Sequence, residues 1–127
     1  MKVKIDTKEK FHIIRLNEST LSANMTEELS VICLEFLSQP LRNLVLDLTE
    51  ISSLELKDAE AIATIQQQFY DSNASFVICS IQPQVEKFLD DNQLLELMNV
   101  TPTESEAWDI LQMEEMEREL LNEENDD

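Results

Sequence analysis

The sequence predicts a mixed α/β fold, in which a sheet of about five strands packs against about four helices. Apolar runs that suit strands alternate along the chain with amphipathic helical segments, and short connections join them. The runs at residues 44–48 and 75–79 are apolar nearly throughout, which is typical of inner strands covered on both faces. The length of 127 residues and the hydrophobic content of 43% fit one domain with one packed core.

The chain begins with a predicted pair of antiparallel strands. Residues 2–5 and 11–16 are rich in β-branched and other apolar side chains, and the polar residues 6–9 between them suit a turn. His12, the one histidine of the chain, lies in the second strand. No serine or cysteine nucleophile is visibly paired with it, so we interpret His12 as a strand residue rather than a catalytic base.

The first helix is predicted from about residue 24 to residue 39, because Pro40 stops it. Asn24 and Glu27 have the spacing of a capping box, in which both side chains bind backbone amides of the first turn. Its apolar positions recur at helical spacing and form one stripe, made of Met25, Leu29, Ile32, Cys33, Phe36 and Leu37. We expect this stripe to cover the sheet.

The second helix is predicted between the two inner strands, from residue 57 to about residue 71. Asn73 follows at a position where helices often end in a left-handed residue, usually a glycine. The helix has one apolar face, formed by Ala59, Ile62, Ile65 and Phe69.

A third helix is predicted to start at Pro83, since proline suits the first helical position. Residues 97–100 then form the last short strand. Thr103 and Glu106 make a second capping box at the start of the final helix. The inward residues of the third helix are Val85, Phe88 and Leu89.

Composition excludes several classes of function. The formal net charge of −18 repels nucleic acid and anionic lipid, because both carry phosphate charge. The chain has no glycine, which excludes phosphate loops, dinucleotide-binding turns and nucleophile elbows. No apolar run is long enough to insert into a bilayer, and the first residues lack the apolar stretch of a signal peptide. We therefore expect a cytoplasmic protein.

Metal, cofactor and enzyme chemistry have little support in the sequence. Cys33 and Cys79 lie in apolar runs, so we expect buried free thiols rather than a disulfide or a zinc site. Glu55, Asp58 and Glu60 cluster near the start of the second helix, where the helix dipole favours negative charge. We interpret them in that way rather than as metal ligands. The sequence predicts no enzyme, metal or cofactor.

Three segments carry short motifs in a characteristic order. Residues 44–51 read L-V-L-D-L-T-E-I, residues 81–89 read I-Q-P-Q-V-E-K-F-L, and residues 101–107 read T-P-T-E-S-E-A. They resemble the hydrophobic-V-L-D-L-S-x-V, L-x-P-x-V-x-x-h-h and T-x-x-E-A segments of the STAS family, the fold of bacterial anti-sigma factor antagonists. The resemblance covers residues 1–112 as one domain. The long acidic last helix is most similar to that of Bacteroidetes STAS proteins.

The sequence departs from this family at the regulatory segment. In STAS antagonists a D-S-S-G segment precedes the second helix, and a partner kinase, which is also the anti-sigma factor, phosphorylates its first serine. Residues 55–58 read E-L-K-D here, so Leu56 stands at the phosphoacceptor position and has no hydroxyl group. The family's upstream L-D-x segment becomes Leu21 and Ser22, so a flanking aspartate is also missing. The resemblance implies a protein-binding module without the usual phosphorylation switch.

The resemblance also places the partner-binding surface at the loop before the second helix and at the start of that helix. The partner it implies is a protein, with an anti-sigma or serine-kinase-like protein as the first candidate. Two other interpretations remain open: an accessory subunit of a transporter or signalling assembly, and phosphorylation moved to the loop serines Ser52 or Ser53. The predicted contact residues are Ser22, Ser52, Ser53, Glu55, Leu56, Lys57, Asp58 and Ile62.

Residues 113–127 extend past the predicted domain as an acidic continuation of the last helix, and residues 122–127 are predicted to be a disordered tail. Methionine-rich apolar faces suit adaptable binding surfaces. We therefore hypothesise that the extension binds a partner or a second copy of the chain. The residues of this second interface are Met113, Met116 and Leu120.

Overall fold

The computed structural model describes residues 2–124 and contains a five-stranded mixed sheet. β1 and β2 run antiparallel, whereas β2, β4, β6 and β7 run parallel to one another. The predicted mixed sheet of five strands is confirmed, and the two apolar runs are its inner strands β4 and β6. In spatial order the strands are β1 (Val3–Thr7), β2 (His12–Leu16), β4 (Leu44–Asp47), β6 (Phe76–Cys79) and β7 (Val100–Thr101).

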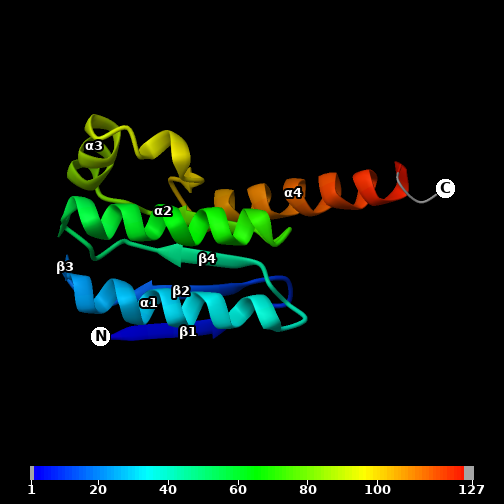
Figure 1. The fold of residues 1–127 in the computed structure, drawn as a ribbon, viewed down its shortest axis with the longest axis horizontal. Coiled ribbons are helices and arrows are strands. Elements are labelled where there is room, and N and C mark those ends of the chain that lie inside the picture. Colours follow the sequence, from blue (N-terminus) through cyan, green and yellow to red (C-terminus); the bar gives the residue numbers. More distant parts are fainter. Residues whose placement is uncertain (1, 125–127) are drawn as a thin grey trace.

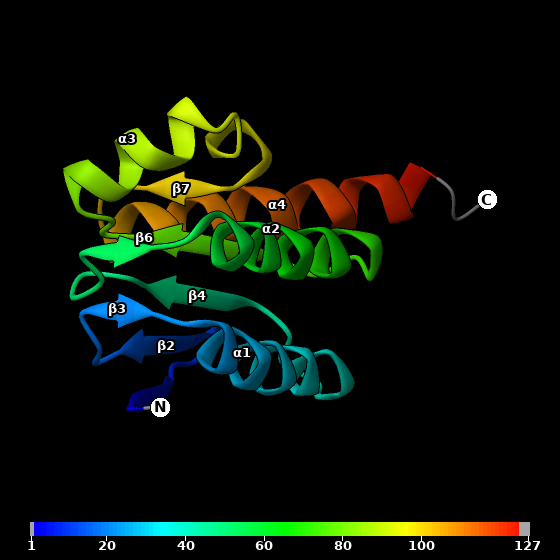
Figure 2. The same ribbon diagram turned by 60° about the vertical axis from the view of Figure 1, so that its left-hand side comes forward.

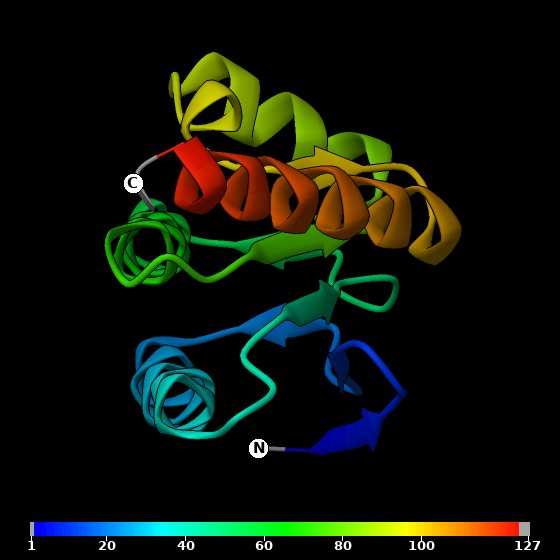
Figure 3. The same cartoon turned by 90° about the vertical axis from the view of Figure 1, so that its right-hand side faces the viewer.

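Four helices cover the two faces of this sheet within the described residues (Figures 1 and 2). Their bounds are α1 (Ala23–Glu35), α2 (Leu56–Asp71), α3 (Pro83–Asp91) and α4 (Glu104–Glu124). α1 and α2 pack against each other on one face of the sheet, and α3 contributes to the same core. α4 contacts β4, β6 and β7 from the other face (Figure 3). The fold is therefore three layers around two apolar cores.

The two cores follow from the alternation of side chains along each strand. In β4, Leu44 and Leu46 point toward α1 and α2, whereas Val45 points toward α4. All four predicted inward residues of α2 are buried in the larger core. The smaller core is closed by Trp108 of α4, whose ring stacks on Phe11 with centroids 5.5 Å apart.

The start of α1 differs from the prediction. Ser22 is the residue before the first helical position, and its side chain makes no capping hydrogen bond, so the predicted capping box at Asn24 is wrong. The chain stays extended through Thr20–Leu21, the strand β3, which pairs with β5 (Ser53–Leu54). The helix therefore begins directly after β3, and Asn24 is an exposed residue of its first turn.

Two helices end in a residue with the left-handed backbone conformation that glycine usually adopts. Asn73, after α2, has a φ of 57°, which confirms the predicted left-handed position. Gln93, after α3, has a φ of 60°. In both places the next amide bonds back across the helix end, from Ala74 to the Phe69 carbonyl at 2.9 Å and from Leu94 to the Leu89 carbonyl at 2.9 Å.

The last short strand, predicted at residues 97–100, is present but starts only at residue 100. Leu95–Leu97 form a 3-10 turn, and the strand is shorter, only Val100–Thr101. Leu94 and Met98 are buried while Leu97 is 60% exposed, which is the spacing of a helical turn and not of a strand.

The capping box of the last helix is confirmed on its threonine side, since the Thr103 hydroxyl accepts a hydrogen bond from the Glu106 amide at 3.2 Å. α4 continues through residues 122–124, which the sequence assigns to the disordered tail. The other tail residues, 125–127, lie outside the described residues.

Candidate functional site

The loops that follow β2 and β4 meet the amino-terminal ends of α1, α2 and α3 at one edge of the sheet (Figure 1, left). This is the edge at which the parallel strands end, and open α/β sheets commonly bind their ligands there. The exposed predicted contact residues gather at this edge. We call this region the carboxyl-edge surface; it consists of Ser22, Ser52, Ser53, Glu55, Leu56 and Lys57.

A short parallel ladder joins the two halves of the carboxyl-edge surface. β3 pairs with β5, with Thr20 opposite Ser53 and Leu21 opposite Leu54. The Ser52 hydroxyl donates to the Ser19 carbonyl at 3.0 Å. Two-residue strands leave no periodic pattern, so the sequence could not predict this ladder. The ladder borders a hollow of about 360 Å³, lined by Thr20, Leu21, Ser22, Ala23, Ser53, Leu54 and Glu55.

α2 presents an apolar side chain at the centre of this surface. Leu56 is the first residue of the helix and is 43% exposed, between the exposed residues Glu55 and Lys57. It occupies the position that the resemblance assigns to a phosphorylated serine. A leucine here has no oxygen for a kinase to modify, but it offers apolar area to a protein partner.

Two of the predicted contact residues do not lie on the surface. Asp58 is 2% exposed, and its carboxylate accepts a hydrogen bond from the Glu55 amide at 3.1 Å. The Thr26 hydroxyl lies 3.5 Å from the same carboxylate. Ile62 is 1% exposed and packs in the larger core. The prediction that both contact a partner is wrong, because the helix caps itself with one and buries the other.

Side chains near the start of α3 fix the loop between β4 and β5. The Gln82 amide donates to the Thr49 carbonyl at 2.7 Å, and the Gln84 amide reaches the Ser52 carbonyl at 3.5 Å. Asp47, the last residue of β4, accepts from the Thr49 amide at 2.9 Å. The predicted contact residues do not include these glutamines. Their place in the I-Q-P-Q motif was the available signal.

A charged cluster lies at the same edge on the α4 face of the sheet. Arg15 of β2 donates to Asp6 at 2.8 Å and to Glu104 at 2.7 Å, and it lies 3.5 Å from Asp47. Glu104 is the first residue of α4, so this cluster ties α4 to three strands. Because Arg15 and Glu104 are 89 residues apart in the chain, no local pattern could predict the pair.

His12 has a structural role in this protein. It is 4% exposed, and its ring lies 4.3 Å from that of Phe36, centroid to centroid. Nε2 donates to the Leu41 carbonyl at 3.0 Å, and Nδ1 forms a hydrogen bond with the Thr7 hydroxyl at 2.8 Å. Both nitrogens are thus engaged, so the strand interpretation of His12 holds.

The cysteines are buried free thiols, as the sequence predicts. Burial raises the pKa of Cys33 to about 12 and is the main cause that raises the pKa of Cys79 to about 11. Both thiols are therefore protonated near neutral pH, which is the poorly nucleophilic form of a cysteine.

The described residues contain no group of three or more histidine, cysteine, aspartate or glutamate side chains placed to hold a metal ion. In the same part of the chain, no helix has both the length and the apolar character needed to cross a membrane.

Solved structures share this fold. An anti-sigma factor antagonist domain protein from Planctomyces limnophilus superposes with a TM-score of 0.73 at 16% identity, covering 87% of this chain and 97% of that one. SpoIIAA, an anti-sigma factor antagonist of Bacillus, gives 0.69 at 15% identity, covering 87% and 96% in its unphosphorylated form. The murine anion transporter Slc26a9 gives 0.67 at 17% identity, covering 82% of this chain but 18% of the transporter. At these identities the likeness shows the fold alone.

Sequence comparison identifies the family. No curated protein matches the chain. The family model described as the STAS domain matches residues 2–107, which is most of the 127-residue sequence. The motif resemblance and the structural likeness agree with this match. The chain belongs to the STAS domain family.

Proposed function

We propose that this chain is a non-catalytic, cytoplasmic protein-binding module that acts like an anti-sigma factor antagonist without the usual phosphorylation switch. Its partner is an anti-sigma or serine-kinase-like protein that binds the carboxyl-edge surface. The proposal goes beyond fold likeness, because it depends on the residues at one position of this surface.

The observation that carries the proposal is the exposed Leu56 at the first position of α2. SpoIIAA has been solved in phosphorylated and unphosphorylated forms, so that relative is modified. In this chain the position that the motif resemblance assigns to the phosphoacceptor has no hydroxyl group, and 43% of Leu56 is available to a partner. Phosphate adds a charge of about −1.5 to −2, which can break such an interface. A leucine keeps the interface permanently neutral and apolar at this point.

The surroundings of Leu56 support binding by a preformed surface. Three contacts hold together the chain segments that lead into α1, α2 and α3. They are the β3–β5 ladder, the hydrogen bond from Ser52 to Ser19 at 3.0 Å and the hydrogen bond from Gln82 to Thr49 at 2.7 Å. A surface whose loops are already ordered loses less entropy when it binds. This favours a constitutive binder over a segment that orders on contact.

The test is affinity capture of the tagged full chain from its native cells, with bound proteins identified by mass spectrometry. Leu56→Glu places a charge at the centre of the surface. Tyr70→Glu is the matched control, because Tyr70 lies on the same helix, is 74% exposed and lies at the other end of α2. We expect the unchanged chain and the control to recover an anti-sigma or serine-kinase-like protein, and Leu56→Glu to lose it. Equal recovery by both variants would place the interface elsewhere.

An accessory subunit of a larger assembly is the second candidate function. The likeness to part of Slc26a9 supports it, because there a domain of this fold makes up a small share of a transporter. Recovery of membrane transporter subunits in the same capture, without a kinase-like protein, would favour this alternative.

Phosphorylation of the loop serines is the remaining route to a switch. Ser52 and Ser53 are exposed, but the Ser52 hydroxyl already donates to the Ser19 carbonyl. Phosphosite mapping of the protein from its native cells tests this idea, and an unmodified loop would end it.

A further inference from the structure

The face that α4 turns toward the domain changes character along its length. Its first half presents Ala107 and Leu111 to the sheet, and both are completely buried. Further along, the same face carries Glu114 and Arg118, at the helical spacing that continues it. The helix therefore meets the domain through apolar contacts first and polar contacts afterwards.

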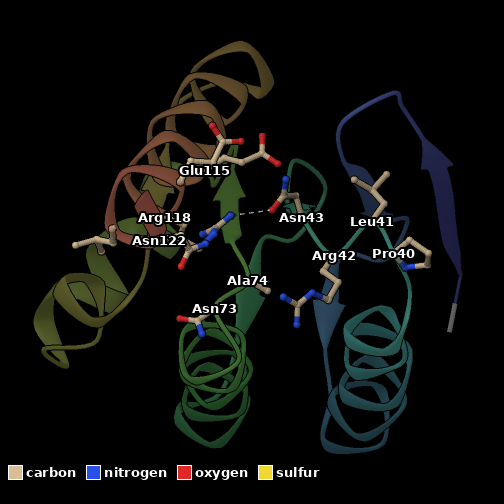
Figure 4. A pocket seen from close by; sticks show the side chains of 11 residues that line it. Pro40, Leu41, Arg42, Asn43, Asn73, Ala74, Glu115, Arg118 and Asn122 are labelled. Atoms are coloured by element: carbon tan, nitrogen blue, oxygen red, sulfur yellow. Dashed lines mark hydrogen bonds between the residues drawn. The ribbon is translucent and has the colours of Figure 1, made fainter. Parts of the chain in front are cut away.

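These polar contacts anchor the second half of α4. The Asn99 side-chain amide donates to Glu114 at 2.8 Å. Arg118 donates to the Ser75 hydroxyl at 2.9 Å and to the Asn43 side-chain oxygen at 3.4 Å, across the hollow drawn in Figure 4. That hollow, of about 620 Å³, separates this half of the helix from the loops before β4 and β6. Within the described residues, neither apolar core includes a residue beyond position 111.

Leu121 lines this hollow, whereas three other apolar side chains of the extension point the other way. Met113, Met116 and Leu120 are 57%, 62% and 58% exposed. Their spacing of three and four residues places them on one side of the helix, opposite Leu111, Glu114 and Arg118. We call these three residues the outer stripe. α4 projects past the sheet here (Figure 1), so the stripe is presented on a helix whose opposite face is already fixed.

Charge decides what can cover the outer stripe. Asp109, Glu117 and Glu119 border it and are exposed. Arg118 is the one basic residue between positions 104 and 124, and it is engaged on the inner face. Two copies paired through the stripe would bring like charges together, which is destabilising. A partner with lysine or arginine beside its apolar residues would instead gain binding free energy both from apolar burial and from the attraction of opposite charges.

We propose that the outer stripe is a docking site for a basic amphipathic helix of a partner protein. Apolar residues of that helix cover Met113, Met116 and Leu120, and its basic residues pair with the bordering carboxylates. Methionine suits this task, since its flexible side chain adapts to the shape of the partner. The site is separate from the carboxyl-edge surface, at the opposite end of the molecule.

The probe for this site is a synthetic amphipathic helix of leucine and lysine, titrated calorimetrically into the full chain. The stripe variant is Met113→Ser with Met116→Ser and Leu120→Ser. Its matched control replaces three other exposed apolar residues, Val31, Tyr70 and Leu97, by serine; these are 60%, 74% and 60% exposed. Far-UV circular dichroism of both variants verifies that the helices are retained.

We expect the peptide to bind the unchanged chain and the control alike, and the stripe variant at least about tenfold more weakly. Reversing the charges that border the outer stripe, with Glu117→Lys and Glu119→Lys, should also weaken peptide binding. A scrambled peptide of the same composition should not bind at the site. Leu56→Glu should leave peptide binding unchanged, so failure here is distinguishable from failure of the proposed function.

Three results would overturn the proposal. One is equal weakening by the stripe variant and its control, which would indicate general attraction to an acidic protein. Another is absence of peptide binding to the unchanged chain. The third is a dimer in sedimentation velocity that the stripe variant abolishes, because a second copy would then be the occupant.

Discussion

Single side chains determine how the helices of this protein begin and end. Asp58 closes the start of α2 by accepting the Glu55 amide, although the family resemblance places a glycine there. At the other ends, Asn73 and Gln93 take positive φ angles in a chain that contains no glycine. For most residues other than glycine the left-handed region costs about 1–2 kcal/mol, and asparagine tolerates it best.

Removing the Asp58 carboxylate should destabilise the protein. Asp58→Ala leaves the Glu55 amide without its partner, and the loss of such a cap costs about 1–2 kcal/mol. The measurement is urea unfolding followed by circular dichroism. Glu60→Ala is the control, since Glu60 is an exposed acid of the same helix. An equal, small effect of both substitutions would show that Asp58 does not cap α2.

Glycine at the end of α3 should stabilise the protein. Gln93→Gly removes the backbone strain of a φ of 60° at a position where the side chain is exposed. We expect the free energy of unfolding to rise by about 0.5–1 kcal/mol after the entropy cost of glycine. Asn73→Gly should gain less, because asparagine already suits its φ of 57°. Thermal unfolding of the two variants compares them directly, and a lower midpoint for Gln93→Gly would contradict the expected strain.

At the scale of elements, α4 is attached to the sheet at three points of different chemistry. The Arg15 cluster holds its first residue, the Trp108–Phe11 stack lies at the smaller core, and Arg118 anchors its second half. The smaller apolar core accounts only for residues 107–111, in the first half of the helix. The polar contacts therefore determine the direction in which the extension leaves the domain.

Loss of the Arg15 side chain should loosen the start of α4. Arg15→Ala leaves Asp6, Asp47 and Glu104 as neighbouring negative charges. We expect the free energy of unfolding to fall by about 1 kcal/mol, and by less at high salt. Lys87→Ala is the control, since it removes the exposed Lys87–Asp91 pair at 2.9 Å and should change nothing measurable. Urea unfolding at two salt concentrations tests both variants. A salt-independent loss in Arg15→Ala would point to packing instead of charge.

For the whole molecule, the dominant physical property is its net charge of −18. Repulsion among 27 acidic side chains opposes the compact state and also opposes self-association. The same field attracts a basic partner and accelerates its approach. The two proposed surfaces lie at opposite ends of the molecule, so one acidic molecule has room for two partners.

Salt should stabilise the folded chain. Screening weakens the overall repulsion more than it weakens the few ion pairs, so we expect the thermal midpoint to rise by about 2–8 °C between low salt and 0.5 M sodium chloride. Potassium chloride should give the same rise, because screening does not depend on which monovalent cation is present. A falling midpoint would mean that attractive pairs such as Arg15–Glu104 dominate the electrostatic energy.

The sequence by itself determined most of the longer strands and the helices, and the faces that these elements bury. The periods of 2 and 3.6 residues are local, so the apolar face of α2 and the buried strands β4 and β6 could be predicted from the residues that form them. Local rules also predicted the left-handed Asn73 and the helix start at Pro83. The family motifs placed Leu56 at the candidate surface.

Only the tertiary structure decided which residues of the candidate surface are accessible. Exposure and partners at one position depend on chain segments far away in sequence, as with Asp58 beside Thr26 and Arg15 beside Glu104. The same holds for the extension of α4, where Arg118 reaches Asn43 and so turns the outer stripe away from the domain. Local sequence patterns determine the helices and strands. Contacts between segments far apart in the chain determine which side chains of those elements are exposed to a partner.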